Sequence, residues 1–196
     1  MTEIKSYEGV TLRENEVFSF LGIHDAAARS ALSDKVLNVI KEIKNAAKPR
    51  LCYARFNIKN EGLLDLGFAK VKSRDLAKNL VDCNSIILVC ATVGLEIDRL
   101  IAKYSRIAPS RAVILQAAGA AAIESVLDRF EDELRAEGLA LKTRFSCGYG
   151  DLPLSLQRDV FSALGCERAI GVTLTDSLLM SPTKSVSAII GVKNEL

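Results

Sequence analysis

The sequence predicts an α+β protein in which a largely antiparallel sheet packs with helices, one of them long, central and rich in alanine. Three observations favour this class: short alternating or wholly apolar stretches, longer segments of helical periodicity bounded by capping residues, and a mixed order of the two along the chain. The length of 196 residues fits a single domain over residues 1–196. Residues 1–48 are expected to form its N-terminal helical part.

The N-terminal quarter is expected to be mainly helical. A short strand within residues 4–12 leads into a brief helix over residues 14–21. Ser33 is a suitable N-cap for a helix that continues to about Ala47. Pro49 then prevents a longer helix, because its ring removes a backbone donor and clashes with the preceding turn.

Two strands and a short helix are expected next. Residues 51–58 alternate between apolar and polar side chains, which is typical of a strand buried on one face. Residues 85–91 read SIILVCA, a wholly apolar run that predicts a strand buried on both faces. Between them, Ser73 can cap a helix over residues 74–81.

The longest helix is expected over residues 109–137, after a shorter one over residues 95–104. Pro109 suits its first turn and Gly138 suits its end. Its middle, AAGAAA at residues 117–122, has almost no side-chain bulk. Small residues allow a close approach of another backbone or of a ligand, and close packing inside the protein is the simpler explanation.

The C-terminal part combines a strand, a loop, a helix and further strands. Residues 139–145 alternate as a strand does, and residues 146–153 form a loop with two glycines and a proline. Residues 154–164 predict an amphipathic helix ended by Gly165. The stretch 169–192 is rich in Val, Ile, Thr and Ser around a proline, which indicates strands around a turn.

Composition argues against several classes of partner. The formal net charge is only +2, and Lys and Arg are spread along the chain, so we expect no nucleic-acid partner. No uninterrupted apolar run reaches about 20 residues, so we expect no membrane association. The charged N-terminus has no apolar segment of the kind found in secretory signals.

Cysteine and histidine usage limit the chemistry further. Five cysteines without CxxC spacing favour structural thiols in a reducing compartment, so we expect a cytoplasmic protein without a metal site. The single histidine, His24, excludes a Ser–His–Asp triad elsewhere in the chain, and Asp25 beside it is the better candidate for a helix cap. The acidic run 131–133 is expected to be a solvated helix face.

The segment RFSCGYGD at residues 144–151 is the strongest candidate for a binding site. Gly148 and Gly150 allow positive φ and exposure of backbone N–H groups to a ligand. Arg144 can form a bidentate pair with a carboxylate, and Tyr149 offers an aromatic face and a hydroxyl. These groups suit a small zwitterion that carries an aromatic base. A simple strand-to-helix connection with a surface salt bridge explains the same residues, and it is the favoured interpretation of these residues alone.

Two blocks of sequence resemble the activation domain of cobalamin-dependent methionine synthase. The family pattern Arg-x-x-Pro-Gly-Tyr is similar to residues 144–149, and its pattern Leu-Thr-Glu-Ser-x-x-Met-x-Pro-x-x-Ser-Val-Ser is similar to residues 174–187. Two blocks at matching separation are more specific than either alone. The resemblance implies a domain, here as a stand-alone protein, that supports reductive remethylation of cob(II)alamin on a separate cobalamin-binding methionine synthase chain. The implied methyl donor is S-adenosylmethionine, and the implied electron source is a flavodoxin-like reductant.

The resemblance also assigns roles to residues. Arg144 would hold the carboxylate of the donor, the backbone at Ser146 and Cys147 would contact its adenosyl part, and Gly148 would allow close approach. Tyr149 would line the pocket. The remaining implied roles belong to Glu124, as a partner for the ammonium or sulfonium charge, and to Met180 and Pro182, as apolar contacts with the corrin ring. No residue is expected to be catalytic, and the chain is expected to have no complete methyltransferase activity alone.

The sequence departs from the family pattern at several places. Cys147 stands where the family has proline, and Asp176 replaces a glutamate. No Asp-Trp segment is found in the N-terminal third, and the sequence stops at Leu196, before the late aromatic residue of the family. We therefore expect the pocket to be completed differently or by a partner.

Other functions remain open at this point. The alternatives are an accessory or interaction protein for another corrinoid methyltransferase, and an unrelated α+β domain that binds a small molecule. Residues 175–187 fit a strand–turn–strand whose hydroxyls satisfy edge hydrogen bonds as well as they fit a corrin-facing segment.

Overall fold

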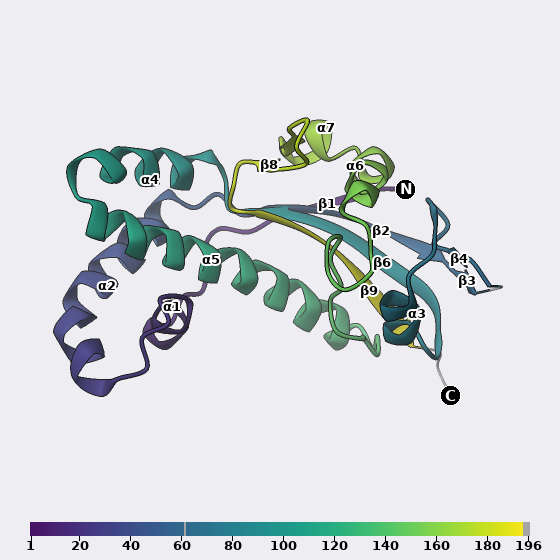
Figure 1. The fold of residues 1–196 in the computed structure, drawn as a ribbon, viewed down its shortest axis with the longest axis horizontal. Coiled ribbons are helices and arrows are strands. Elements are labelled where there is room, and N and C mark those ends of the chain that lie inside the picture. The colour runs from purple at the N-terminus through teal and green to yellow at the C-terminus, as the bar shows by residue number, and fades with distance from the viewer. Residues whose placement is uncertain (61, 194–196) are drawn as a thin grey trace.

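A four-stranded antiparallel sheet lies at the centre of the protein, in the strand order β1-β2-β6-β9 (Figure 1). The computed structural model describes residues 1–60 and 62–193. The strands of this sheet are β1 (Glu3–Ser6), β2 (Arg50–Asn57), β6 (Cys83–Thr92) and β9 (Ser185–Lys193). The predicted α+β class with an antiparallel sheet and one long helix is confirmed.

Helices cover both faces of this sheet and extend well beyond one end of it. They are α1 (Glu14–Phe20), α2 (Ala26–Ala46), α3 (Arg74–Asn79), α4 (Leu95–Ile107), α5 (Pro109–Ala136), α6 (Gln157–Leu164), α7 (Cys166–Ile170) and the 3₁₀ turn Leu154–Leu156. In Figure 1, α1, α2 and α4 surround the first half of α5 at the left, and the second half of α5 runs along the sheet. The short helices α6 and α7 lie on the opposite side of the sheet.

Two minor sheets complete the architecture. The strands β3 (Lys59–Asn60), β4 (Leu64–Asp65) and β5 (Lys70–Val71) form a small three-stranded sheet that leads into α3. The strands β7 (Thr173–Leu174) and β8 (Met180–Ser181) form a hairpin before β9. The sequence did not predict the three-stranded sheet, because strands of two residues carry no detectable periodicity.

Two hydrophobic cores lie on opposite faces of the sheet, and β6 contributes to both. Ile87 and Val89 point into the core shared with α1, α2, α4 and α5, which we call the α5 core. Ile86 and Leu88 point into the core shared with α3, α6 and α7, which we call the α6 core. The predicted strand with two buried faces is therefore confirmed. Burial of apolar surface on this scale is the main stabilising term of the fold.

Small residues in α5 allow close packing inside the protein, which confirms the simpler explanation of the AAGAAA stretch. A Cβ added to Gly119 would lie 3.2 Å from Cγ2 of Ile97 in α4 and 3.1 Å from Cε of Lys184 beside β9. Ala118 and Ala122 are completely buried in the same core. By length and composition α5 alone among the described residues would be able to cross a membrane, but 61% of its most apolar window is buried inside the protein.

Two predicted elements of the N-terminal half are corrected. The helix expected after an N-cap at Ser33 begins eight residues earlier, at Ala26, because the carboxylate of Asp25 accepts a hydrogen bond from the Ala28 amide at 2.8 Å. Asp25 is thus a helix cap, as its position beside His24 suggested. The strand β2 was expected to be half-buried, and it is so from Ala54 to Asn57. Leu51 and Cys52, in contrast, are both fully buried because each faces one of the two cores.

The strand expected over residues 139–145 is also corrected. This segment follows the outer edge of β9 and pairs with it only through isolated bridges, at Leu141–Val192 and Phe145–Ile189. Leu141 packs against the α5 core, whereas Phe145 packs against the α6 core. The segment crosses from one face of the sheet to the other, so a regular strand cannot persist along it. Further on, residues 166–170 form α7, where strand was expected from residue 169.

Candidate ligand-binding site

Arg144 lies at the edge of the central sheet, at the point where the chain passes from one face to the other. Its neighbour Phe145 exchanges backbone hydrogen bonds with Ile189 of β9, at 2.9 and 2.8 Å. This pairing fixes the backbone of Arg144, and its side chain reaches across to the second half of α5. The side chain is 22% exposed, and its guanidinium faces α5 rather than bulk water.

Three carboxylates from one face of α5 surround that guanidinium. Nη2 of Arg144 lies 2.9 Å from Glu124, and Nη1 lies 2.8 Å from Asp128 and 2.7 Å from Glu131. Residues spaced by four and three positions share one side of a helix, which explains why all three reach the same group. The structure therefore brings together Arg144 and Glu124, two of the predicted site residues, as a direct ion pair.

Sequence reasoning missed two members of this cluster. Asp128 follows Glu124 by one helical turn, so helical spacing was the signal that would have found it. Glu131 was expected to lie on a solvated face, but it is only 8% exposed and accepts hydrogen bonds from Arg144 and from Arg135, each at 2.7 Å. A buried carboxylate requires such cationic partners, because an unpaired one would be costly.

The carboxylates raise the pKa of Arg144 above its ordinary value. Burial of the guanidinium works in the opposite direction, but it is outweighed by the hydrogen bond with Asp128 and the charges of Glu131 and Glu124. The group is therefore a permanent cation. Because Arg135 also pairs with Glu131, three carboxylates share two guanidiniums. One negative charge is left in excess, and this surrounding suits a ligand that itself carries a positive group.

The loop after Arg144 is a compact turn closed by its own backbone. Gly148 and Gly150 have φ values of 91° and 53°, as predicted for glycines that adopt left-handed conformations. The Gly148 amide donates to the Leu152 carbonyl at 3.0 Å, and the Tyr149 amide donates to the Ser146 carbonyl at 3.2 Å. The expectation that the glycines free their N–H groups for a ligand is thus wrong for Gly148, whose N–H closes the loop.

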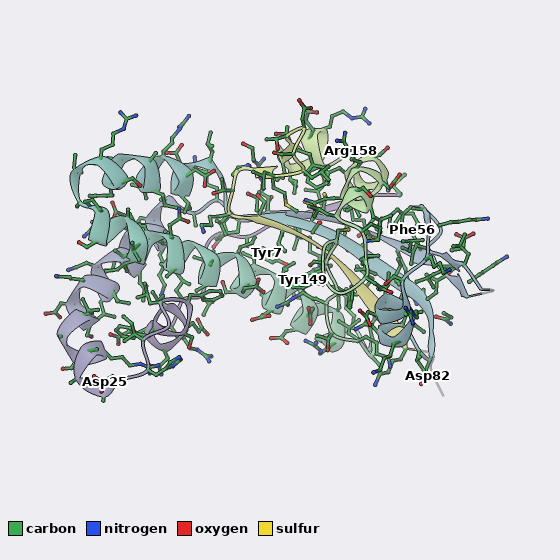
Figure 2. All side chains as sticks on the ribbon, in the orientation of Figure 1. Tyr7, Asp25, Phe56, Asp82, Tyr149 and Arg158 are labelled. Carbon is green, nitrogen blue, oxygen red and sulfur yellow. The ribbon has the colours of Figure 1, made fainter. Side chains whose placement is uncertain are left out.

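Tyr149 is the most accessible side chain of this loop. It is 67% exposed and projects from the loop near the middle of the molecule in Figure 2. Ser146 and Cys147, which precede Gly148 in the loop, are half-buried. An exposed aromatic side chain between two glycines is available for stacking on a flat ligand.

Cys147 is a neutral thiol at physiological pH. It packs against the α6 core, and burial raises its pKa to about 11. The reactive species of cysteine is the thiolate, so this environment makes the residue inert. Cys147 therefore acts as a small apolar side chain at the position where the family pattern has proline.

The two residues that the resemblance placed beside a corrin ring lie in strand β8 of the hairpin and directly after it. Met180 is half-buried against the α6 core, and Pro182 is buried. The accessible apolar side chain of the hairpin is instead Leu179, which is 66% exposed. Leu178 before it adopts a φ of 65°, a strained conformation for a non-glycine residue, within a turn closed by Thr175.

An open hollow of about 490 Å³ adjoins the Arg144 cluster. It is lined by Asp128, Glu131, Asp132 and Arg135 of α5 and by residues 141–144. Hollows of this size are within the range that accepts small-molecule ligands. Among residues 1–60 and 62–193, no group of three or more histidine, cysteine or carboxylate side chains is arranged to hold a metal ion.

The fold and this site define an α+β domain in which an arginine–glycine–tyrosine loop meets an acidic helix face. Residues 132–195, which include this loop, the hairpin and β9, match a family model described as "Vitamin B12 dependent methionine synthase, activation domain". The resemblance found in the two sequence blocks is therefore confirmed.

A solved structure extends the likeness to the whole chain. The protein is similar to a chain described as "Crystal Structure of the MetH Reactivation Domain bound to AdoHcy", with 13% sequence identity and a TM-score of 0.72. The match covers 100% of this chain and 79% of that chain. At this identity the likeness establishes the fold. No curated protein sequence is significantly similar to the chain.

Proposed function

We propose that this protein binds S-adenosylmethionine and supports reductive remethylation of cob(II)alamin held by a cobalamin-binding methionine synthase chain. The observation that carries the proposal is the Arg144–Glu124 ion pair beside the exposed Tyr149 loop, in which Arg144 and the loop belong to the residues that match the activation-domain model. A flavodoxin-like reductant is the proposed electron source, and the cytoplasm is the proposed location.

The residues of the site fit a ligand with an amino-acid end and a flat base. The amino-acid end of S-adenosylmethionine carries one carboxylate and one ammonium, and these match the two charges of Arg144 and Glu124. Binding would exchange an internal ion pair for two ligand contacts, without leaving either charge unpaired. Such an exchange limits the desolvation cost that a single charged contact would carry.

The excess negative charge of the cluster favours the sulfonium form of the ligand. When Arg144 and Glu124 turn to the ligand, Asp128 remains near the site, whereas Glu131 keeps its ion pair with Arg135. The charge of Asp128 attracts the additional positive charge that S-adenosylmethionine carries and S-adenosylhomocysteine lacks. The site would therefore hold the methyl donor more tightly than the product and release the product after methyl transfer.

The contribution of this chain to the reaction is positioning. A sulfonium transfers its methyl group without a general acid or base, so no side chain of the site has to donate or accept a proton. Bound cobalamin on the partner would supply the reduced metal that accepts the methyl group. Holding donor and acceptor in line supplies a large part of the rate enhancement in such reactions.

The first experiment measures S-adenosylmethionine binding by calorimetry in the unmodified protein and in Arg144→Lys and Glu124→Gln. Each substitution keeps the size of the side chain nearly constant, and Arg144→Lys also keeps its charge. We expect each to weaken binding by about tenfold, because one charge-assisted contact is lost. Equal affinity in all three proteins would exclude the proposed exchange.

A truncated ligand provides the control. Methylthioadenosine has the adenosyl part without the amino-acid end, so its affinity should be the same in the unmodified protein and in both variants. A parallel loss of methylthioadenosine binding would show that the substitutions disturb the whole site. If the unmodified protein binds neither compound but is retained by a corrinoid protein, an interaction role for another corrinoid methyltransferase becomes the better proposal.

A further inference from the structure

The glycine–tyrosine loop is anchored by a helix that precedes it by more than seventy residues in the sequence. Asp151, at the end of the loop, places its carboxylate at the first turn of α3. It accepts hydrogen bonds from the Ser73 hydroxyl, from the Arg74 amide at 2.8 Å and from the Asp75 amide at 3.2 Å. The unpaired amides at the start of a helix are thereby satisfied by a residue of the loop.

The contact is reciprocal, because α3 also binds the loop backbone. The carboxylate of Asp75 accepts a hydrogen bond from the Asp151 amide at 3.2 Å. The same carboxylate lies directly over Gly150, and a Cβ at that position would overlap it. Gly150 is therefore required twice, by its φ of 53° and by the close approach of Asp75.

The ionised form of Asp151 is the one that fits this arrangement. The hydrogen bonds from the Ser73 hydroxyl and the Arg74 amide lower the pKa of the carboxyl group below its ordinary value. Above that pKa both carboxylate oxygens are acceptors, as the three hydrogen bonds that they receive require. We call this set of contacts between Asp151, Asp75 and the start of α3 the loop clamp.

The loop clamp and a buried leucine hold Tyr149 between them. Leu152 is 2% exposed in the α6 core, and its amide donates to the Tyr149 carbonyl at 3.0 Å. The Gly148 amide closes the loop on the Leu152 carbonyl. Without the loop clamp, the exposed side of this turn would be held only by its own backbone bonds.

We infer that Asp151 and Asp75 are positioning residues, which set the conformation in which the loop presents Tyr149 and the backbone of residues 146–148 to a ligand. Neither side chain has to touch the ligand. The inference about loop order stands on the contacts alone, and its consequence for S-adenosylmethionine rests on the proposed function.

The first test needs no ligand. The chain contains no tryptophan, so Tyr149→Trp introduces a single fluorescent reporter into the loop. We expect Asp151→Ala to lower the fluorescence anisotropy of this reporter and to accelerate amide exchange at Gly148 and Leu152. Asp151→Asn, which keeps one acceptor oxygen, should have an intermediate effect.

Asp25 provides a matched control. It caps α2 through the Ala28 amide, also at 2.8 Å, and Figure 2 places it at the left end of the molecule, well away from Tyr149 near the middle. Asp25→Ala removes a helix cap in the same way and should lower the melting temperature by roughly 2–4 °C. It should leave the reporter anisotropy and the exchange of loop amides unchanged, which separates loop positioning from general stability.

The second test measures S-adenosylmethionine affinity in otherwise unmodified protein. Asp151→Ala should weaken binding by about tenfold or more, because misplaced contact groups lose much of their effect, whereas Asp25→Ala should not change it. Gly150→Ala should weaken binding to a similar extent. The double variant Gly150→Ala/Asp75→Ala should bind only slightly more weakly than Gly150→Ala, since the two changes disrupt one contact.

The outcomes separate this inference from the proposed function. Unchanged anisotropy and amide exchange in Asp151→Ala would overturn the loop clamp, even if the unmodified protein binds S-adenosylmethionine. Absence of binding by the unmodified protein would overturn the proposed function, while a mobile loop in Asp151→Ala would still support the clamp. Equal effects of Asp25→Ala and Asp151→Ala on the loop would also overturn the inference.

Discussion

Cys147 shows how its surroundings decide the chemistry of a single side chain. It lies in the candidate binding loop, where a reactive thiol would suggest redox regulation. Its contact with the α6 core removes water from the thiol and disfavours the charged form. The residue is therefore better described as an apolar contact that stabilises the base of the loop.

The reactivity of Cys147 provides a pH-dependent prediction. With a pKa of about 11, its thiolate population at pH 8 should be on the order of 100-fold below that of an ordinary cysteine. Alkylation by iodoacetamide, followed at this residue by mass spectrometry, should be slow at pH 8 and should still increase between pH 9 and 11. The same protein unfolded in urea is the control, and a native rate that levels off near pH 8.5 would contradict the prediction.

The raised pKa of Cys147 also determines how the free energy of unfolding changes with pH. The unfolded chain ionises this thiol at its ordinary pKa, while the native protein keeps the proton to higher pH. The stabilisation is thus fully present below about pH 8.5. It should decrease as the pH rises from there towards 11.

Among the helices, α5 combines two different surfaces along its length. Its first half is lined by small residues that allow α4 and the stem of Lys184 to approach, as the clearance at Gly119 shows. Its second half presents Glu124, Asp128 and Glu131 to Arg144. One continuous helix therefore links the helical end of the molecule to the candidate site.

The clearance at Gly119 predicts a graded response to larger side chains. Gly119→Leu should destabilise the protein by about 1–3 kcal/mol, because the new side chain overlaps Ile97 and Lys184. Gly119→Ala should have a smaller effect, since its better helix propensity offsets part of the crowding. Urea denaturation of the two variants and of the unmodified protein measures the change in the free energy of unfolding.

An exposed position of the same helix serves as the control. Gln116→Leu adds a similar apolar side chain at a site open to solvent, and it should change the free energy of unfolding by less than about 0.5 kcal/mol. Equal losses at both positions would show that the close packing around Gly119 is not what limits side-chain size there.

The molecule as a whole is organised around one sheet that separates two cores. Because β6 supplies successive residues to opposite faces, neither core can open without disturbing the strand that both share. This arrangement predicts that the two cores unfold together, in one cooperative transition.

Two adjacent substitutions in β6 test this coupling. Ile87→Ala in the α5 core and Leu88→Ala in the α6 core should each lower the free energy of unfolding by about 2–5 kcal/mol. In both variants, circular dichroism and tyrosine fluorescence should report the same midpoint. Leu37→Ala, at a largely exposed position of α2, is the control and should have little effect. Separate midpoints for the two probes would show that the cores are independent.

The sequence alone determined the fold class, the central strand buried on both faces, the long helix and most helix ends. These features depend on apolar periodicity and on capping residues such as Asp25 and Ser73, and both signals are contained within a few consecutive residues. The arginine–glycine–tyrosine motif was visible for the same reason. Its left-handed glycines and its match to the activation-domain model follow from local sequence.

Only the tertiary structure decided what these groups contact. The partners of Arg144 depend on how α5 lies against the edge of the sheet. Asp151 binds the start of α3, which lies more than seventy residues earlier in the chain. The break in the expected strand at residues 139–145 has the same origin, because the chain there crosses between two cores. Charge pairing and strand regularity at such places depend on packing between distant segments, which no local pattern records.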